Sequence, residues 1–441
     1  MRFLLASFVG KTLCWMVCLA CTGLAGFAGE KVYFVGGDKE AGKAAAATAG
    51  AKWVKSLTKG LAKAAADLNG GKNQVTLKVA AGAFKGDLGS GAYQLPQFNN
   101  PAGTLTLIGG YDAQFAKRDP FGTPSTIETI ADRSAPLWTF ARNSKLKGLV
   151  VDGLVWDTTA SNRYDAKTNS LLKGTSSTHV FIKFNYFETD HLEFRNSVFL
   201  NAAHRVMEPL IRAASPKAVV RFHNSIFLNC VIPLKLESAH FRNKPALVEV
   251  DHCSFLLNWA YNPDPNTGNP AALEIGNKSA AQEIKITNNL FYANFGGAIL
   301  ALNLQMPALT INNNNFVGNG MLHGQSEPEA VAMIVSAGGR KQPIPVDAIE
   351  DVPAVDEAED NVSIAPGIPL SLGEVKTVDA SKVKVEKTWM NEVNRLLGRN
   401  LSGGKVAISD YAPKKSYDPA RPPFASKDEA KAYGASPSLV R

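Results

Sequence analysis

Five segments of the chain share one alternation of apolar and polar residues. Each reads apolar, polar, apolar, polar, then Asn or His, and ends on a Phe after two further residues. The segments are Leu192–Phe199, Val220–Phe227, Val248–Phe255, Ile284–Phe291 and Leu309–Phe316. Their terminal Phe residues lie 28, 28, 36 and 25 residues apart. Period-two alternation is typical of a strand with one buried face, and repeats of this length indicate a stacked array.

A single strand in about 28 residues cannot pair with its neighbour as a hairpin. The chain must travel around and return in parallel, so we predict an all-β solenoid, specifically a right-handed parallel β-helix. Equivalent residues should then stack at about the 4.8 Å strand spacing. The expected columns are aliphatic (Leu192, Val220, Val248, Ile284, Leu309), mixed apolar (Phe194, Phe222, Val250, Ile286, Ile311), aromatic (Phe199, Phe227, Phe255, Phe291, Phe316) and an amide ladder (Asn196, Asn224, Asn288, Asn313).

The outward positions of the same strands test this stacking independently. From coil to coil they are Glu193, Arg221, Glu249, Lys285 and Thr310, so the charge alternates over four successive coils. Opposite charges on neighbouring strands attract, whereas like charges directly opposed would repel. The alternation therefore favours in-register parallel strands, and it speaks against a catalytic site on this face.

The chain divides into five parts on this interpretation. They are a leader (1–28), an N-terminal segment with an amphipathic capping helix over Ala51–Leu68 (29–74), the parallel β-helix (75–340), an acidic, Pro-rich linker lying on or past the last coil (341–375), and a C-terminal cap and tail (376–441). Val75–Gly82 is expected to be the first coil strand, and Thr104–Gly110 and Gly148–Trp156 further coils. A short helix is expected around Trp389–Leu397, followed by a loosely ordered tail.

Residues 1–28 predict export. They carry Arg2 and Lys11, run apolar from Thr12, and end in the small-residue step Gly26-Phe27-Ala28, as a cleavable signal peptide does. Two alternatives stay open: an uncleaved anchor helix, and a lipoprotein signal at Cys21. We expect an exported protein, extracellular, surface-bound or periplasmic, without a stable membrane span.

The net charge and the cysteine content bear on the possible partners and disulfides of the protein. The formal net charge of the 441 residues is +8, with basic and acidic residues interleaved, and the sequence shows no nucleic-acid motif. Three of the five cysteines fall in the leader, which leaves Cys230 and Cys253. They occupy different phases of the repeat, so two buried thiols are expected, with a strained bridge as the alternative.

Two further stretches carry a family resemblance. Val79-Ala-Ala-Gly82 and the run Gly109–Pro120, followed by Pro124-Ser-Thr126, resemble segments near the start of many bacterial exported right-handed β-helix proteins of the pectate-lyase-like superfamily. With the repeats, the resemblance covers roughly Val32–Asn319. The resemblance implies the β-helix fold. It does not single out one activity, because that superfamily holds polysaccharide lyases, glycoside hydrolases and adhesins.

A second strand column supplies candidate chemistry. If the registers match, it brings together Lys183, Arg212, Lys235, Glu237 and Glu274. A lyase acting beside a uronate carboxylate needs a base and a cation such as Ca²⁺. Arg212, Lys235 and Glu237 are the catalytic candidates, Lys183 would bind substrate, and Glu274, with Glu237, would bind metal. The alternative is a second solvated charge ladder.

Two predicted protruding loops, Asp157–Ser177 and Tyr261–Asn269, flank this column. Asp264 begins an Asp-Pro-Asn-Thr-Gly run with Ca²⁺-like oxygen ligands, although an ordinary turn would also use it. Trp259 and Tyr261 would stack on sugar rings or pack in the coil wall.

The four histidines of the repeat region, His204, His223, His240 and His252, show no metal-ligand spacing, and His252 is expected to hydrogen-bond within its turn.

The sequence thus predicts a protein that binds or processes an extracellular or envelope polysaccharide, with a lyase as the catalytic version. The alternative is a surface, adhesion or envelope structural protein without catalysis. Converging Arg212, Lys235 and carboxylates would favour the enzyme, whereas a flat, charge-paired wall would favour adhesion.

Overall fold

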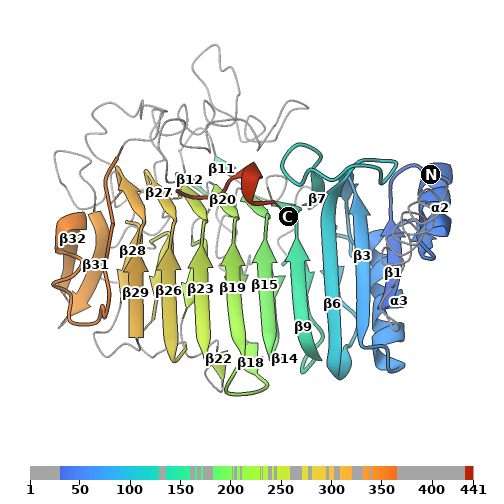
Figure 1. Ribbon diagram of the computed structural model, residues 1–441, viewed down its shortest axis with the longest axis horizontal. Helices are drawn as coiled ribbons and strands as arrows, with labels where there is room; N and C mark the ends of the chain where they lie inside the picture. Colours follow the sequence, from blue (N-terminus) through green and yellow to red (C-terminus); the bar gives the residue numbers. More distant parts are fainter. Residues whose placement is uncertain are drawn as a thin grey trace, which may run out of the picture.

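The protein is described by a computed structural model (Figure 1). It describes residues 30–128, 136–158, 164–165, 170–171, 182–200, 202, 206–208, 211–228, 230, 232–236, 241–242, 246–258, 271–276, 281–294, 297–301, 308–319, 331–337, 340–364 and 433–440. Three predicted features lie outside these residues: the leader over 1–28, the helix around Trp389–Leu397 and the loop Tyr261–Asn269.

The chain forms an all-β parallel solenoid, as the repeat predicts. Its long sheet runs in the order β2-β1-β3-β6-β9-β15-β19-β23-β26-β29, with every neighbouring pair parallel (Figure 1). Its strands are β1 (Glu30–Val35), β2 (Lys52–Val54), β3 (Gln74–Ala80), β6 (Asn99–Tyr111), β9 (Lys145–Asp152), β15 (His191–Arg195), β19 (Val219–His223), β23 (Leu247–Asp251), β26 (Glu283–Thr287) and β29 (Ala308–Asn312).

Two other sides complete each coil. The second sheet contains β4 (Gly82–Phe84), β7 (Ser125–Glu128), β10 (Leu154–Asp157), β16 (Val198–Leu200), β20 (Ile226–Leu228), β24 (Ser254–Leu256), β27 (Leu290–Tyr292) and β30 (Asn315–Val317). The third side has two groups: β5 (Tyr93–Gln94), β8 (Trp138–Thr139), β13 (Ile182–Lys183) and β17 (Met207–Glu208), then β21 (Leu234–Leu236), β25 (Leu273–Ile275), β28 (Ile299–Ala301), β31 (Val331–Ala337) and β32 (Arg340–Pro345). Only β31 and β32 in these sets pair antiparallel.

The predicted columns fill the interior. Strands β15 to β29 pair so that the aliphatic residues stack in register, and all of them are buried. The five Phe rings from Phe199 to Phe316 lie parallel, with successive centroids 4.8, 4.9, 4.8 and 5.1 Å apart. Trp156, from the earlier predicted coil, extends this stack onto Phe199. Fully buried aromatic rings supply much of the apolar area that holds successive coils together.

The turn after the long sheet has a left-handed backbone in every repeat coil. Its residue is Asn196, Asn224, His252, Asn288 or Asn313, with φ between 46° and 58°. Asn adopts this conformation more easily than other non-glycine residues, because its short side chain bonds locally. The Asn224 amide donates to Asn196 Oδ1 at 2.7 Å, and Asn313 donates to Asn288, so the predicted ladder forms on both sides of His252.

Two more amide ladders reinforce the corners. Asn258, Asn294 and Asn319 are buried and joined side chain to side chain, each bond being 2.8 Å. Asn289, Asn314 and Asn361 form the other ladder. These side chains also bond to backbone groups of neighbouring coils, which pairs polar groups that the turns would leave buried and unsatisfied.

The N-terminal cap differs from the prediction. Helix α3 spans Leu57–Asn69 and begins after Ser56, whose hydroxyl accepts from the Lys59 backbone N–H. Residues 52–54, expected inside the helix, form β2 because they pair with β1 at the sheet edge. A further helix, α2 (Lys39–Thr48), precedes it. The strand expected to open the sheet, β3, is therefore preceded in the sheet by β1 and β2.

The acidic segment continues the coil at the other end. After a short 3-10 helix (Val346–Ala348), the Ile311 N–H donates to Glu357 O at 2.8 Å and the Phe316 N–H to Val362 O at 2.9 Å. Asn361 joins the ladder of Asn314. Residues 357–362 thus cover the exposed edge of the last coil, which a solenoid end requires.

Part of the expected loose tail is also ordered. Residues 433–440 include a 3-10 turn at Pro437–Leu439. They pack on the row of left-handed turns that runs from Asn196 to Asn313, here called the turn row, and Tyr433 and Ala435 are buried. Cys230 and Cys253 are two buried thiols and form no disulfide. None of the helices among the described residues has the length and apolar character needed to cross a membrane.

Candidate functional site

The second strand column is partly assembled as predicted. Lys235 on β21 and Glu274 on β25 are directly paired, and their side chains form an ion pair of 2.9 Å. The Lys235 and Glu274 side chains are only 13 % and 10 % exposed. The carboxylate proposed as a metal ligand is therefore already paired with the ammonium group of a largely buried lysine.

Arg212 lies elsewhere, which corrects the assumed register. It belongs to β18 (Ile211–Ala213), which pairs with β14 (Phe187–Thr189) and β22 (Phe241–Arg242), short strands attached to the long sheet (Figure 1). Its guanidinium lies 3.8 Å from Glu188. The reason is local: β17, not the segment around Arg212, occupies the third side in this coil, so alignment by apolar residues selected the wrong strand.

Lys183 is on the third side, where β13 pairs it with Glu208 of β17 and Thr139 of β8. The other candidates, Glu237, Trp259, Tyr261 and Asp264, lie outside the described residues. Of the predicted loop Asp157–Ser177, β11 (Tyr164–Asp165) and β12 (Ser170–Leu171) form an antiparallel pair. The described residues therefore bring together Lys235 with Glu274, but not Arg212 with either.

The outward face of β15, β19, β23, β26 and β29 carries two adjoining polar rows, here called the polar wall. The first row is Glu193, Arg221, Glu249, Lys285 and Thr310, and the second is Arg195, His223, Asp251, Thr287 and Asn312. Both rows are in register, as the alternating charges predict. Arg221 bonds to Glu249 on the next coil, whereas Lys285 pairs with Glu283 of its own strand at 2.9 Å.

The Glu193 carboxylate is compensated by neighbouring side chains of the same sheet. It accepts from His191 at 3.2 Å and lies 3.6 Å from Arg195. Burial alone raises the pKa of Glu193, but the His191 hydrogen bond and the charges of Arg195, His191 and Arg221 outweigh it, so the pKa falls below its ordinary value. Each charge of the first row is thus compensated by an opposite charge, either in the row or beside it.

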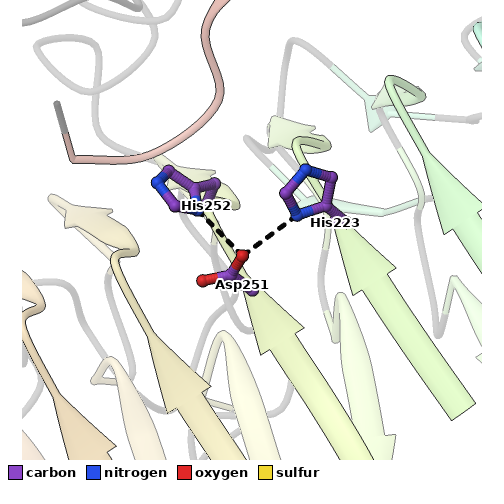
Figure 2. Close-up of side chains that lie close together, drawn as sticks. All are labelled: His223, Asp251 and His252. Carbon is purple, nitrogen blue, oxygen red and sulfur yellow. Dashed lines mark hydrogen bonds and ion pairs between the residues drawn. The ribbon is translucent and has the colours of Figure 1, made fainter. Parts of the chain in front are cut away.

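The second row contains a cluster of different chemistry. His223 ends β19, Asp251 ends β23, and His252 follows in the left-handed turn (Figure 2). Asp251 Oδ2 accepts from His223 Nδ1 at 3.0 Å and from His252 Nδ1 at 2.8 Å. One ligand atom from each residue lies within 4.8 Å of the others, and all three side chains are partly exposed. Two imidazoles therefore converge on one carboxylate oxygen at the surface.

The other carboxylate oxygen is held from the next coil. Asp251 Oδ1 accepts from Thr287 Oγ1 and Asn288 Nδ2, both at 2.8 Å. Burial raises the pKa of Asp251, but the hydrogen bonds from His223, His252, Asn288 and Thr287 outweigh it and hold the pKa far below the usual carboxyl range. The carboxylate is therefore ionised and fixed in orientation.

The spacing of the histidines along the sequence did not reveal this cluster. Local spacing looks for ligands a few residues apart, whereas parallel stacking brings together residues one full coil apart. His223 and Asp251 occupy the same phase of the repeat, 28 residues apart, and this signal was available in the sequence. His252 does hydrogen-bond beside its turn, as expected. His204 and His240 lie outside the described residues.

The C-terminal segment crosses the same coils. Gly434 N–H donates to Asn288 O, Ala435 N–H to Ser254 Oγ, both at 2.8 Å, and Ser436 N–H to Asn224 Oδ1 at 2.6 Å. Asn224 and Asn288 are the turn residues on either side of His252. A Cβ at Gly434 would stand 2.4 Å from Ser254 Oγ, which explains the glycine. The segment therefore spans the coil that carries the cluster.

Comparison of the chain with protein-family models, with curated proteins and with solved structures found no match. The polar wall and the cluster are therefore the features of the chain that bear on its function. The first row of the wall pairs charged side chains with opposite charges. The cluster instead joins one carboxylate to two imidazoles, which are bases that can also be neutral.

Proposed function

We propose that the protein is exported and binds an extracellular or envelope polysaccharide along the polar wall without cleaving it. The supporting observation is the regularity of the wall: five neighbouring strands present two polar side chains each, in register, beside one another. A polymer with repeating hydroxyl or carboxylate groups would meet polar side chains at the same two positions of each coil, although the residue types differ from coil to coil. The leader over residues 1–28 supports export.

A lyase at the second column has weaker support. In a lyase, the base and the cationic residue that neutralises the uronate carboxylate must face one bound sugar. Arg212 and Lys235, the two candidates for these roles, belong to different sheets, and each lies beside a carboxylate partner. A general base must carry a free lone pair, whereas the largely buried Lys235 is ion-paired with Glu274 as an ammonium group, which would first have to give up a proton. A flat wall with compensated charges instead favours the binding alternative.

Binding by such a surface needs no deep pocket. A stiff solenoid loses little conformational entropy when a polymer lies along it, because its side chains are held by stacking in successive coils. Individual contacts to exposed polar groups are weak, so affinity would come from repetition over several coils. We therefore expect longer oligosaccharides to bind more tightly than short ones.

The test is retention of the purified chain on a panel of uronate-containing and neutral polysaccharides, with and without Ca²⁺. Unsaturated ends and reducing ends are followed in the same samples. We expect retention on at least one polysaccharide and no new ends of either kind. New unsaturated ends would replace this proposal by the lyase, and passage through every column without retention would reject polysaccharide binding.

A pair of variants locates the surface. Arg221→Ala combined with Lys285→Ala removes two cations from the wall and should weaken retention. Lys85→Ala is the control, because Lys85 is also a surface cation paired with a carboxylate, Glu128 of β7, but it lies directly after β4 of the second sheet, away from the wall. Equal loss of retention in both would show that binding reflects general charge and would count against the wall.

A further inference from the structure

The His223–Asp251–His252 cluster has the donor set of a transition-metal site. Zinc is bound by imidazole nitrogen and carboxylate oxygen at about 2.0–2.2 Å, and catalytic zinc sites have three protein ligands and one open position. Here both imidazole Nδ1 atoms already face one carboxylate oxygen, at 3.0 and 2.8 Å, and the three ligand atoms lie within 4.8 Å of one another. Small rotations of the side chains would place them around one ion.

We propose that His223, Asp251 and His252 form a binding site for a divalent transition-metal ion of the Zn²⁺ class. Two imidazoles and one carboxylate suit Zn²⁺, Ni²⁺ or Cu²⁺. Ca²⁺ takes six to eight oxygen ligands, and Mg²⁺ keeps an octahedral shell of oxygens and waters, so this donor set disfavours both. The site is therefore different from the Ca²⁺ site that a lyase would require.

The surrounding residues support the ligands as metal sites require. Groups that hydrogen-bond to metal ligands fix their orientation, and losing one weakens metal binding. Thr287 and Asn288 hold the Asp251 oxygen that faces away from the imidazoles. Since His223 and Asp251 end paired strands of the long sheet, their backbones are fixed by the parallel ladder.

Charge and access are also suitable. The carboxylate contributes one negative charge, and neutral imidazoles can bind a cation through Nδ1 while the ring proton moves to Nε2. The side chains of His223 and His252 are 29 % and 24 % exposed, so an ion can reach them from solvent. Arg195, which precedes His223 in the second row, forms an ion pair with Asp152 at 2.9 Å, so its positive charge is already compensated.

The amide ladder does not account for a histidine at position 252. Four of the five turn residues are Asn, and those flanking His252 form side-chain bonds to their outer neighbours. His252 instead directs its ring to Asp251, and Asn224 Oδ1 accepts from the backbone of Ser436. An Asn at 252 would satisfy the turn, whereas a His adds a metal ligand.

The experiment uses the full chain, purified without a histidine tag and stripped of metal with a chelator. Zn²⁺ is titrated calorimetrically in excess Ca²⁺, and Co²⁺ is used as a spectroscopic probe of nitrogen and oxygen ligation. We expect one saturable site that Ca²⁺ does not occupy. His252→Asn should weaken Zn²⁺ binding by more than about 100-fold, and Thr287→Val, which removes one bond to Asp251, by about 10- to 100-fold.

His191→Asn is the matched control, because His191 is also a histidine beside a carboxylate on the same sheet but lies outside the cluster. It should leave Zn²⁺ affinity unchanged. Circular dichroism checks that His252→Asn is folded, and Asn at this turn has four precedents in the same protein. No saturable Zn²⁺ binding, or equal affinity in wild type and a folded His252→Asn variant, would overturn the proposal.

Discussion

The Phe stack inside the solenoid and the turn row at its corner are built by the same repeat, yet they vary differently. The stack keeps Phe in all five coils, and its rings lie parallel at nearly constant spacing. The turn row keeps its left-handed backbone in all five coils, but one of its residues is His252 instead of Asn. Over these five coils the Phe stack keeps one residue type, whereas the turn row changes once.

This difference separates residues that maintain the fold from residues that add chemistry. A ring inside the stack touches rings above and below, so a smaller side chain leaves a gap in both contacts. A turn residue needs only a compatible backbone and a partner for its polar atoms. A departure from the repeat is therefore most informative at the corner, where the fold permits it, and there His252 meets His223 and Asp251.

Phe255→Ala should have the largest effect on the comparison. The Phe255 ring is fully buried between Phe227 and Phe291, with centroids 4.9 and 4.8 Å away. Its removal should lower the free energy of unfolding by about 3–5 kcal/mol, measured as a shift of the urea midpoint. Ile364→Ala, at an exposed hydrophobic residue, is the control and should change stability by less than about 0.5 kcal/mol. Similar shifts in both would mean that the stack is not a principal source of stability.

Asn294→Ala tests whether the buried ladders matter comparably. Its side chain accepts from the Asn258 amide at 2.8 Å and donates to Phe255 O at 3.0 Å, and the residue is fully buried. Its loss leaves buried partners unsatisfied, which should lower the free energy of unfolding by about 1–3 kcal/mol. Asn73→Ala, at an exposed asparagine, should have little effect on the same denaturation curve. A neutral Asn294→Ala would contradict a structural role for the ladder.

The sequence allowed prediction of features that recur in every coil. The interior columns, the alternating charges and the Asn turns each appear several times, so their register can be checked within one chain. The helix over Ala51–Leu68 occurs once, and there the prediction missed β2, because pairing with β1 outweighs helical spacing. Single occurrences provide no such internal check.

The candidate site was predicted less well than the fold. Arg212 was placed by similarity of short apolar triplets, although β17 occupies that position in its coil. The docking of residues 433–436 uses backbone N–H groups, which every non-proline residue has, so residue type does not reveal it. The cluster could have been found, since His223 and Asp251 share one repeat phase.

Glu193→Gln should have a pH-dependent effect. Because the folded-state pKa of Glu193 is lowered, its stabilisation is present above the ordinary carboxyl pKa and is lost as pH falls below about 4. The groups that face it are His191 and Arg195 on β15 and Arg221 on β19. The variant should be less stable than wild type near neutral pH, and the difference should shrink between about pH 5 and about pH 3.

Thermal unfolding over that range measures the difference, with Glu40→Gln on α2 as the control for an exposed carboxylate. A Glu193→Gln difference that stays constant or grows with acid would show that the carboxylate charge is not what stabilises the first row of the wall.

His252→Asn should have the smallest effect on stability, and this small effect is what distinguishes the corner from the interior. The backbone at 252 has a φ of 50°, which Asn adopts in the four equivalent turns. The lost bond from His252 to Asp251 leaves the carboxylate with His223, Thr287 and Asn288, so it is not stranded. We expect the free energy of unfolding of the chelator-treated protein to change by less than about 0.5 kcal/mol. Added Zn²⁺ should then stabilise wild type and not the variant, because only a ligand that binds the folded state raises its stability. If the free energy of unfolding of the metal-free variant fell by several kcal/mol, His252 would instead be a structural residue, required by the fold as the Phe rings are.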